Sequence, residues 1–408
     1  MSKLEEMLRY VSEHNDFYKN RIKEYGIKDP LDITQWPILT RKELQENRYN
    51  MFSDGYKSKY FYQNLRRQSS SGATGVPVSV YWDDRDYYLS IRTIWKKRLH
   101  YNGIRPNDNQ VVFGLSSPSM IDDGVRYVTD PKNVLNFNIN SVRNDNECIV
   151  VLDLIDSFRP TWMYIRPYVL NKLINMYAIT GRTPPSSLKY IESVSEILTH
   201  ELRQKATDFF RVPIANMYGS EEMNGIAYEL PGDVMRVFED NVYAECLCKD
   251  ENICRSGHGD LIVTNLYNRA MPLIRYAQGD TVSLDFISND GFSMSQVVST
   301  VSGRTLDNIC VNGCTINAII LLEIMSEVNN IYNSILAYYH FVFYKETLEC
   351  LFYIELEKNR IEWYTSVELT IEKVFDDKVP KYTGIKAKVL LESNRGPLNK
   401  KHRLLEIK

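Results

Sequence analysis

Short apolar runs alternate with amphipathic stretches through the middle of the chain. Four runs have the length and composition of buried strands: QVVFGL (110–115), TWMYI (161–165), YIESV (190–194) and IANMY (214–218). Two stretches between them repeat apolar residues at helical spacing, PYVLNKLINMYAI (167–179) and HELRQKATDFF (200–210). Strands that alternate with helices predict an α/β fold with a largely parallel sheet, in which ligands bind where the strands end.

The first 65 residues have a helical pattern. Leu4, Leu8 and Val11 fall on one face of a predicted helix. Further along, TRKE (40–43) has the spacing of a capping box, which predicts that a helix begins there.

The pattern changes after about residue 302. It predicts a helix at NAIILLEIM (317–325), a hairpin of ILAYYHFVFY (335–344) with LECLFYIEL (348–356), a helix at VELTIEKVF (367–375) and a last strand at AKVLLE (387–392). This order is typical of a small α+β domain. We therefore expect a large α/β domain over residues 1–303 and a small α+β domain over residues 304–408.

Composition and charge exclude several classes of protein. Apolar residues make up 44% of the 408 residues, and the net charge of −3 comes from 49 basic and 52 acidic residues that are well interspersed. Such a balance offers no basic surface for nucleic acid. No apolar run approaches the roughly 20 residues that span a bilayer, and the N-terminus lacks a signal-peptide core. Seven cysteines without a disulfide framework favour the cytoplasm, and a homodimer stays open as the oligomeric state.

One cysteine cluster has a spacing that suits zinc. Cys246, Cys248, Cys254 and His258 supply four soft ligands in the pattern C-x-C-x5-C-x3-H. Cys246 and Cys248, however, stand two apart in a predicted strand and would share a face for that reason alone. The spacing therefore favours ordinary buried or edge thiols over zinc.

The turn SSSGATG (69–75) combines hydroxyls with glycines between two predicted strands. Backbone N–H groups in such a turn form an anion nest that suits phosphate oxygens. The lysine of a P-loop is missing, because Val76 stands in its place. A plain hairpin turn is the alternative.

Two further segments carry candidate chemistry. In NMYGSEEMNG (216–225), Tyr218 and Gly219 offer a ring and bare backbone to a flat ligand, while Glu221 and Glu222 offer carboxylates to Mg²⁺. A helix start that favours paired glutamates is the alternative. In PLIRYAQGDTV (272–282), Asp280 on a loop is suited to accept hydrogen bonds from a ribose diol, and a simple QGD turn is the alternative.

These segments occur in an order that resembles one family. The glycine turn, YGSEE, RYAQGD, GRTLD (303–307) and the terminal NKKHR (399–403) resemble the adenylate-forming superfamily, on its phenylacetate–CoA ligase and capsule-biosynthesis branch. The resemblance covers nearly the whole chain, including FYKNRIKEYGI (17–27) and WPILTRKEL (36–44). It implies a large N-terminal adenylation domain and a small, mobile C-terminal domain that carries the catalytic lysine.

The resemblance also assigns roles. The phosphates of ATP would lie on the turn, at Ser70, Ser71, Gly72, Thr74 and Gly75. Tyr218, with Gly219, would stack on adenine, Asp280 would bind the ribose, and Arg304 would complete the nucleotide site.

The remaining roles concern catalysis and the acid. Glu222 would ligate Mg²⁺, Lys400 would drive adenylation, and Arg403 matches the arginine of the same motif. The acyl pocket would be bordered by Trp162, Tyr164, Pro167, Ser195 and Glu196.

The resemblance implies a ligase that uses ATP to activate a carboxylic acid as acyl-AMP and passes it to CoA, with an aryl acid as the nearest expectation. Two alternatives stay open. In the first alternative, the acceptor is an amine in polysaccharide or secondary metabolism. In the second, the chain is a non-catalytic nucleotide-binding homologue. The second is suggested by Val76, Leu306 and Asn399, which depart from the family's pattern.

Overall fold

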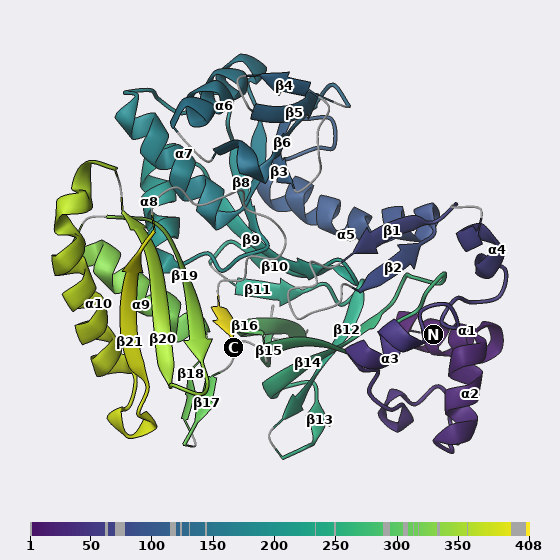
Figure 1. The fold of residues 1–408 in the computed structure, drawn as a ribbon. Helices are drawn as coiled ribbons and strands as arrows, with labels where there is room; N and C mark the ends of the chain where they lie inside the picture. Colours follow the sequence, from purple (N-terminus) through teal and green to yellow (C-terminus); the bar gives the residue numbers. More distant parts are fainter. Residues whose placement is uncertain are drawn as a thin grey trace. The chain divides into compact units, whose positions relative to one another are not determined.

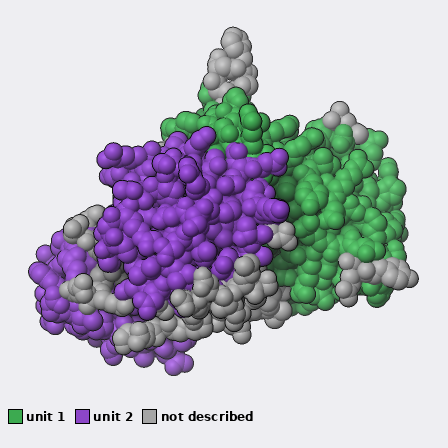
Figure 2. Space-filling view, turned by 90° about the horizontal axis from the view of Figure 1, so that it is seen from above, with its two compact units in different colours: residues 1–106, 215–301 green, residues 107–214, 302–408 purple. Residues whose placement is uncertain are grey.

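A computed structural model describes the chain in two compact units (Figures 1 and 2). The described residues are 2–61, 64–69, 78–114, 120–122, 125–129, 131–142, 145–232, 234–248, 250–288, 294–304, 309–312, 314–316, 318–332, 335–356, 358–392 and 405–408. Unit 1 comprises residues 1–106 and 215–301, and unit 2 comprises residues 107–214 and 302–408.

Unit 1 begins with helices and ends with strands. Its helices are α1 (Lys3–His14), α2 (Asp16–Glu24), α3 (Arg41–Glu46), α4 (Tyr56–Phe61) and α5 (Asp84–Asn102). Its strands are β1 (Arg66–Ser69), β2 (Ser79–Trp82), β9 (Ile214–Ser220), β10 (Asn224–Leu230), β11 (Val234–Val237), β12 (Val242–Cys248), β13 (Ile253–Cys254), β14 (Gly257–Asn265), β15 (Tyr276–Ser288) and β16 (Met294–Arg304).

The helical N-terminus is confirmed. Leu8 and Val11 of α1 are fully buried in the core of unit 1, and Leu4 packs against it. The capping box at Thr40 is also present, because the Thr40 hydroxyl accepts from the Glu43 N–H and the Glu43 carboxylate accepts from the Thr40 N–H. This cap fixes where α3 begins.

The strands of unit 1 pair antiparallel. Along the sheet the order is β13-β12-β14-β15-β16-β11-β10-β9, and β1 pairs with β2 as a separate ribbon. The prediction of a largely parallel sheet is therefore wrong for this unit. Its strands follow one another through short turns, and such connections give antiparallel pairs.

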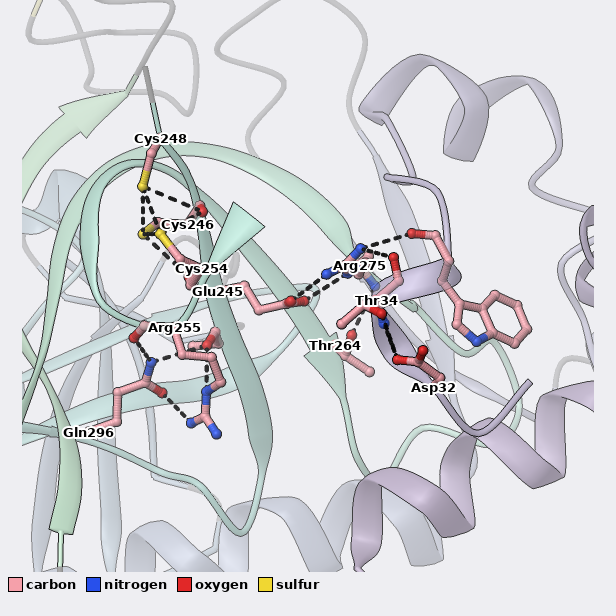
Figure 3. Close-up of polar contacts among 12 residues, drawn as sticks. Asp32, Thr34, Glu245, Cys246, Cys248, Cys254, Arg255, Thr264, Arg275 and Gln296 are labelled. Carbon is pink, nitrogen blue, oxygen red and sulfur yellow. Dashed lines mark hydrogen bonds and ion pairs between the residues drawn. The ribbon is translucent and has the colours of Figure 1, made fainter. Parts of the chain in front are cut away.

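One buried ion pair joins the N-terminal segment to the sheet of unit 1 (Figure 3). Arg275, just before β15, donates to both carboxylate oxygens of Glu245 on β12, at 2.9 and 2.5 Å. Its Nη1 also donates to the carbonyl oxygens of Thr34 and Trp36. Both charged side chains are only 4% exposed. A planar guanidinium matches a carboxylate in this bidentate way and still has donors for the backbone.

Residues 107–214 of unit 2 follow the predicted α/β alternation. The elements are β3 (Gln110–Gly114), β4 (Met120–Asp122), β5 (Val125–Thr129), β6 (Val134–Asn138), α6 (Asp145–Phe158), β7 (Trp162–Ile165), α7 (Pro167–Ile179), β8 (Tyr190–Val194) and α8 (His200–Phe210). In the order β8-β7-β3-β6, neighbouring strands pair parallel as predicted, whereas β5 and β4 add antiparallel. Apolar residues of α6, α7 and α8 pack with those of the strands in one core.

Residues 302–408 have a core of their own. The elements are β17 (Ile309–Val311), β18 (Cys314–Ile316), α9 (Ala318–Ile331), β19 (Leu336–Tyr344), β20 (Glu349–Leu356), α10 (Tyr364–Lys378), β21 (Lys386–Leu391) and β22 (Leu405–Ile407). The predicted hairpin β19–β20 is present, and α9 and α10 cover one face of its sheet (Figure 1). Strand β22, which pairs parallel with β19, was not predicted. These elements fit the predicted small α+β domain, and the division near residue 303 stays a prediction.

None of the helices in the described ranges is both long and apolar enough to cross a membrane.

The ion pair at Arg275 predicts a large loss of stability when one partner is removed. Arg275→Ala should lower the free energy of unfolding by about 3–5 kcal/mol, because it leaves the Glu245 carboxylate buried without a cation. Urea denaturation followed by tryptophan fluorescence measures this loss. Combining Arg275→Met with Glu245→Leu should restore most of it, since no buried charge then remains unpaired.

The matched control for this prediction is an exposed pair. Lys42 and Glu46 lie 3.8 Å apart with side chains 82% and 59% exposed. Lys42→Ala should cost less than about 0.5 kcal/mol. An Arg275→Ala variant as mild as Lys42→Ala would show that the buried pair does not hold this unit together.

Candidate functional site

The segment NMYGSEEMNG forms a tight hairpin between β9 and β10 of unit 1. Gly219 faces Gly225 across the two strands. A Cβ atom on Gly219 would lie 2.1 Å from the Asn224 carbonyl oxygen, so only glycine permits this approach of the two backbones. Glu221 and Glu222 lie in the turn of this hairpin, and the alternative of a helix start is therefore wrong.

Asp280 lies in strand β15 and not on a loop. Between the pairs Asp260–Thr281 and Ile262–Ala277, β14 contributes only Leu261 while β15 contributes residues 278–280. This bulge interrupts the regular pairing of β15. Bulges of this kind aim side chains away from the ordinary alternation, and they are frequent beside functional sites.

Tyr218, Gln278 and Asp280 form one hydrogen-bonded cluster. The Tyr218 hydroxyl donates to Oδ2 of Asp280 at 2.5 Å. The Gln278 amide donates to the same carboxylate oxygen at 2.8 Å and to the Tyr218 hydroxyl at 3.2 Å. These three bonds fix the position of the tyrosine hydroxyl and the direction of the carboxylate. The residue predicted to stack on adenine and the residue predicted to bind ribose are thus in direct contact.

The contacts between β9 and β15 continue along both segments. Ser220 donates from its hydroxyl to the Gln278 side-chain oxygen at 3.1 Å, and Tyr276 donates to Glu222 at 3.5 Å. β16, β11 and β10 stand between β15 and β9 in the sheet, so the sheet must curl for these side chains to meet. Residues 218, 220 and 222 therefore face residues 280, 278 and 276 in turn.

Glu222 is a buried carboxylate with a nearby cation. Arg41, the first residue of α3, places Nη1 at 3.7 Å from Oε1 of Glu222. Burial raises the pKa of the neighbouring Tyr276 hydroxyl, and the Glu222 charge raises it further, so Tyr276 stays a hydrogen-bond donor to this carboxylate. A carboxylate oxygen is a hard ligand of the kind that Mg²⁺ prefers. Because Mg²⁺ is commonly held by one or two carboxylates together with substrate phosphates, Glu222 fits the predicted role.

The edge of the predicted phosphate loop lies beside the tyrosine hairpin. Gln68 on β1 donates to the Asn224 side-chain oxygen at 3.2 Å, and Asn224 donates to the Ser90 hydroxyl on α5. The pairing of β1 with β2 confirms the two strands that were predicted on either side of this segment. The loop residues themselves, Ser70, Ser71, Gly72, Thr74 and Gly75, lie outside the described residues.

The segments GRTLD and NKKHR also lie mostly outside the described residues. Lys400 and Arg403 are not among the described residues. Arg304 is the last residue of strand β16. The roles of these three residues stay predictions.

The predicted acyl-pocket residues lie in unit 2, on and after two parallel strands. Pro167 begins α7 directly after β7, and Ser195 follows β8 at a φ of 70°. Glu196 accepts a hydrogen bond from the Tyr168 N–H at 3.3 Å and lies 3.6 Å from the Arg166 guanidinium. The carboxyl ends of β7 and β8 thus bring Pro167 and Glu196 into one neighbourhood, where α/β sheets commonly bind ligands.

Trp162 and Tyr164 occupy other parts of β7. Trp162 begins the strand, is fully buried and stacks on Tyr190 with a centroid distance of 6.2 Å. Tyr164 is half-buried nearer the carboxyl end of the strand. The structure therefore places Tyr164 nearer than Trp162 to the strand ends, and the pocket role of both stays a prediction.

Sequence reasoning gave no role to Arg41, Gln278 or Gln68, although each contacts a predicted site residue or its hairpin. For Gln278 a signal existed, since it stands two residues before Asp280 in a strand and such residues face the same way. For Arg41 and Gln68 no local signal existed, because their partners are more than a hundred residues away along the chain.

Known proteins resemble this chain in both sequence and structure. No family model matches it. A phenylacetate–coenzyme A ligase of Thermus thermophilus is 23% identical over 335 residues, which span 77% of this chain and 71% of that protein. Protein CapK of Staphylococcus aureus is 22% identical over 302 residues, which span 69% of this chain and 62% of that protein.

The fold resembles that of solved CoA ligases. A 2-hydroxyisobutyryl-CoA ligase in its postadenylation state, in complex with 2-HIB-AMP, superimposes with a TM-score of 0.74 at 16% identity. The match covers all of this chain and 88% of that one. The predicted fold class is therefore confirmed. The chain is a relative of the phenylacetate–CoA ligases and CapK, and it has the fold of the adenylate-forming ligases.

Proposed function

We propose that this AMP-forming ligase activates a carboxylic acid with ATP and then transfers the acyl group to the thiol of CoA. An aryl acid is the substrate class that we favour, because one of the sequence relatives named above is a phenylacetate–CoA ligase. An amine acceptor is the main competing outcome, and the experiments below distinguish it.

The observation that carries the proposal is the cluster of Tyr218, Gln278 and Asp280. It joins an aromatic ring and a carboxylate through bonds of 2.5, 2.8 and 3.2 Å. The family resemblance of the sequence matches Tyr218 to adenine stacking and Asp280 to ribose binding. The face of an aromatic ring can stack on a base, and a carboxylate is a strong acceptor for a diol. Glu222 and the anchor of the phosphate loop at Gln68 belong to the same unit.

The first step is an attack on the α-phosphate of ATP. The substrate carboxylate oxygen forms a bond to this phosphorus, and pyrophosphate leaves with the electrons of the broken P–O bond. The obstacle is the repulsion between two anions, which a positioned cation removes. Lys400 would place an ammonium group between the carboxylate and the α-phosphate. When bound, Mg²⁺ on Glu222 would neutralise phosphate charge.

The second step transfers the acyl group. The sulfur of CoA attacks the acyl carbon of acyl-AMP, its thiol proton passes to solvent, and AMP leaves with the electrons of the broken C–O bond. For Lys400 to leave the reaction centre, the small domain would turn about residues 304–307. This would be a hinge motion of the kind by which domains and lids close around ligands. Residues 305–307 lie outside the described chain.

Acid-dependent release of pyrophosphate tests the proposed function directly. Purified protein with ATP and Mg²⁺ should release pyrophosphate when a substrate acid is added, and aryl acids should be the best of a mixed panel. With CoA present, mass spectrometry should find the acyl-CoA. Acyl products that form only when an amine is supplied would show that the acceptor is an amine and not CoA. If no acid of the panel causes pyrophosphate release, a non-catalytic homologue is favoured.

The nucleotide site makes a separate prediction. Asp280→Ala should weaken ATP binding at least about tenfold, since one charged hydrogen bond contributes about 1.5–3 kcal/mol. Tyr218→Ala should weaken it further than Tyr218→Phe, because phenylalanine keeps the stacking ring and loses only the bond to Asp280. Isothermal titration calorimetry with ATP measures all three.

The control for Asp280 lies on the same strand. Asp285 is an exposed carboxylate of β15 that contacts Ser256 and Ser299. Asp285→Ala should leave ATP affinity unchanged. If Asp280→Ala and Tyr218→Ala bind ATP as tightly as Asp285→Ala, the nucleotide does not bind at this cluster.

Lys400 should be needed for adenylation and not for transfer. Lys400→Ala should slow acid-dependent pyrophosphate exchange by about 10²–10³-fold, the usual loss when one preorganised charge at a transition state is removed. Formation of acyl-CoA from chemically made acyl-AMP should survive. Lys401→Ala is the matched control and should behave as wild type. Equal, small effects of the two substitutions would mean that the terminal lysines are only solvated surface charges.

A further inference from the structure

Three cysteines converge at one end of the unit 1 sheet, apart from the nucleotide residues. Cys246 and Cys248 lie on β12, and Cys254 ends the short edge strand β13 (Figure 3). Cys246 pairs with Cys254 across the two strands. Across the parts of the chain that the structure describes, no other set of three histidine, cysteine or acidic side chains gathers its ligand atoms within 4.8 Å of one another.

The distances between the sulfur atoms match a metal site. Sγ of Cys246 lies 3.7 Å from that of Cys248 and 3.8 Å from that of Cys254. In a tetrahedral site with metal–sulfur bonds of about 2.3 Å, neighbouring sulfurs are about 3.8 Å apart. The third pair, Cys248 and Cys254, is closer at 2.8 Å and would have to open by about 1 Å, which a small rotation of either side chain allows.

The backbone leaves room for these sulfurs. A Cβ atom on Gly257 would lie 2.8 Å from Sγ of Cys248, 3.2 Å from Sγ of Cys254 and 3.5 Å from Sγ of Cys246. Gly257 also has a φ of +149°, which side-chain-bearing residues rarely adopt. Any other residue would therefore fill the space around which the three thiols gather.

The three cysteines differ in their exposure to solvent. Cys246 is fully buried, whereas Cys248 and Cys254 are half-buried at the edge of the sheet. An ion bound to the three sulfurs would therefore keep an open position on the outer side. His258, the fourth residue of the sequence pattern, is exposed and holds Ser283 through Nδ1 at 2.9 Å, and it is not part of the converging group.

We propose that Cys246, Cys248 and Cys254 form a three-thiolate site for a thiophilic divalent ion such as Zn²⁺, with water in the fourth position. Three thiol protons are exchanged for three metal–sulfur bonds, so no oxidant or reductant is needed. The ion ties β12 to the edge strand β13. This site is independent of the proposed ligase activity, because none of its ligands takes part in the hydrogen bonds that join Tyr218, Gln278 and Asp280.

Cobalt titration tests this site. The full chain is purified, fully reduced and stripped with a chelator, and Co²⁺ is then added without oxygen. We expect one equivalent to give thiolate-to-cobalt charge-transfer absorption with the strong visible bands of a tetrahedral site, and one equivalent of Zn²⁺ to displace it. Cys246→Ser, Cys248→Ser and Cys254→Ser should each weaken binding by more than about 100-fold, since loss of even an outer-shell partner costs about 10–100-fold.

Two other buried thiols supply matched controls. Cys148 and Cys350 are free cysteines in other cores of the molecule. Cys148→Ser and Cys350→Ser should bind Co²⁺ as the wild type does. The bound ion should also raise the melting temperature of the wild type and of these two controls, but not that of the three site variants. Circular dichroism of each metal-free variant checks that its fold is retained.

Three outcomes would overturn the proposal. The reduced wild type binds neither Co²⁺ nor Zn²⁺, or binding persists in all three site variants. In the third outcome, the reduced protein binds no metal. After exposure to air, mass spectrometry then shows a mass lower by two hydrogens, because Cys248 and Cys254 have formed a disulfide. That result would make the cluster a redox pair.

Discussion

The buried pair of Arg275 and Glu245 is the constraint on which unit 1 depends. Arg275 occupies a left-handed backbone conformation at φ 50°, which costs about 1–2 kcal/mol for a residue with a side chain. It is held there because its N–H donates to Thr264, its carbonyl accepts from Leu39, and its guanidinium binds Glu245 and the N-terminal segment. The strand β15 starts at the next residue. The ion pair therefore sets where β15 begins and so where its bulge and Asp280 fall.

The same anchor places the N-terminal helices. Leu39 exchanges backbone bonds with Arg275 and Ala277, as a one-residue extension of the sheet. Thr40 then caps α3, and the first residue of that helix is Arg41, which reaches Glu222. The backbone pairing of Leu39 and the capping box at Thr40 thus position the Arg41 guanidinium beside Glu222, the predicted magnesium ligand. Arg41 and Glu222 are about 180 residues apart along the chain. The start of α3 and the predicted magnesium site are therefore linked through Arg41.

Polar residues of the candidate site are positioned by one another more than by the local backbone. The Tyr218 hydroxyl, the Gln278 amide and the Asp280 carboxylate orient one another through three mutual hydrogen bonds. Such networks are sensitive to the loss of a single member, since each remaining half-buried group then loses a hydrogen-bond partner. The cysteine cluster on β12 and β13 is different. Its geometry comes from cross-strand register and from the absence of a side chain at Gly257.

The sequence by itself determined the elements whose signals are local. The helices 167–179 and 200–210, the strand 190–194 and the cap at Thr40 follow from apolar spacing and from a side chain three residues from its partner. The order of its motifs also determined the family resemblance, because that order is a property of the chain alone. Only the tertiary structure decided the antiparallel sheet of unit 1, the contact of Tyr218 with Asp280, the Arg41–Glu222 pair and the meeting of three sulfurs. Each of these depends on strand register, on a bulge or on segments far apart in the chain, and local spacing carries no information about such distances.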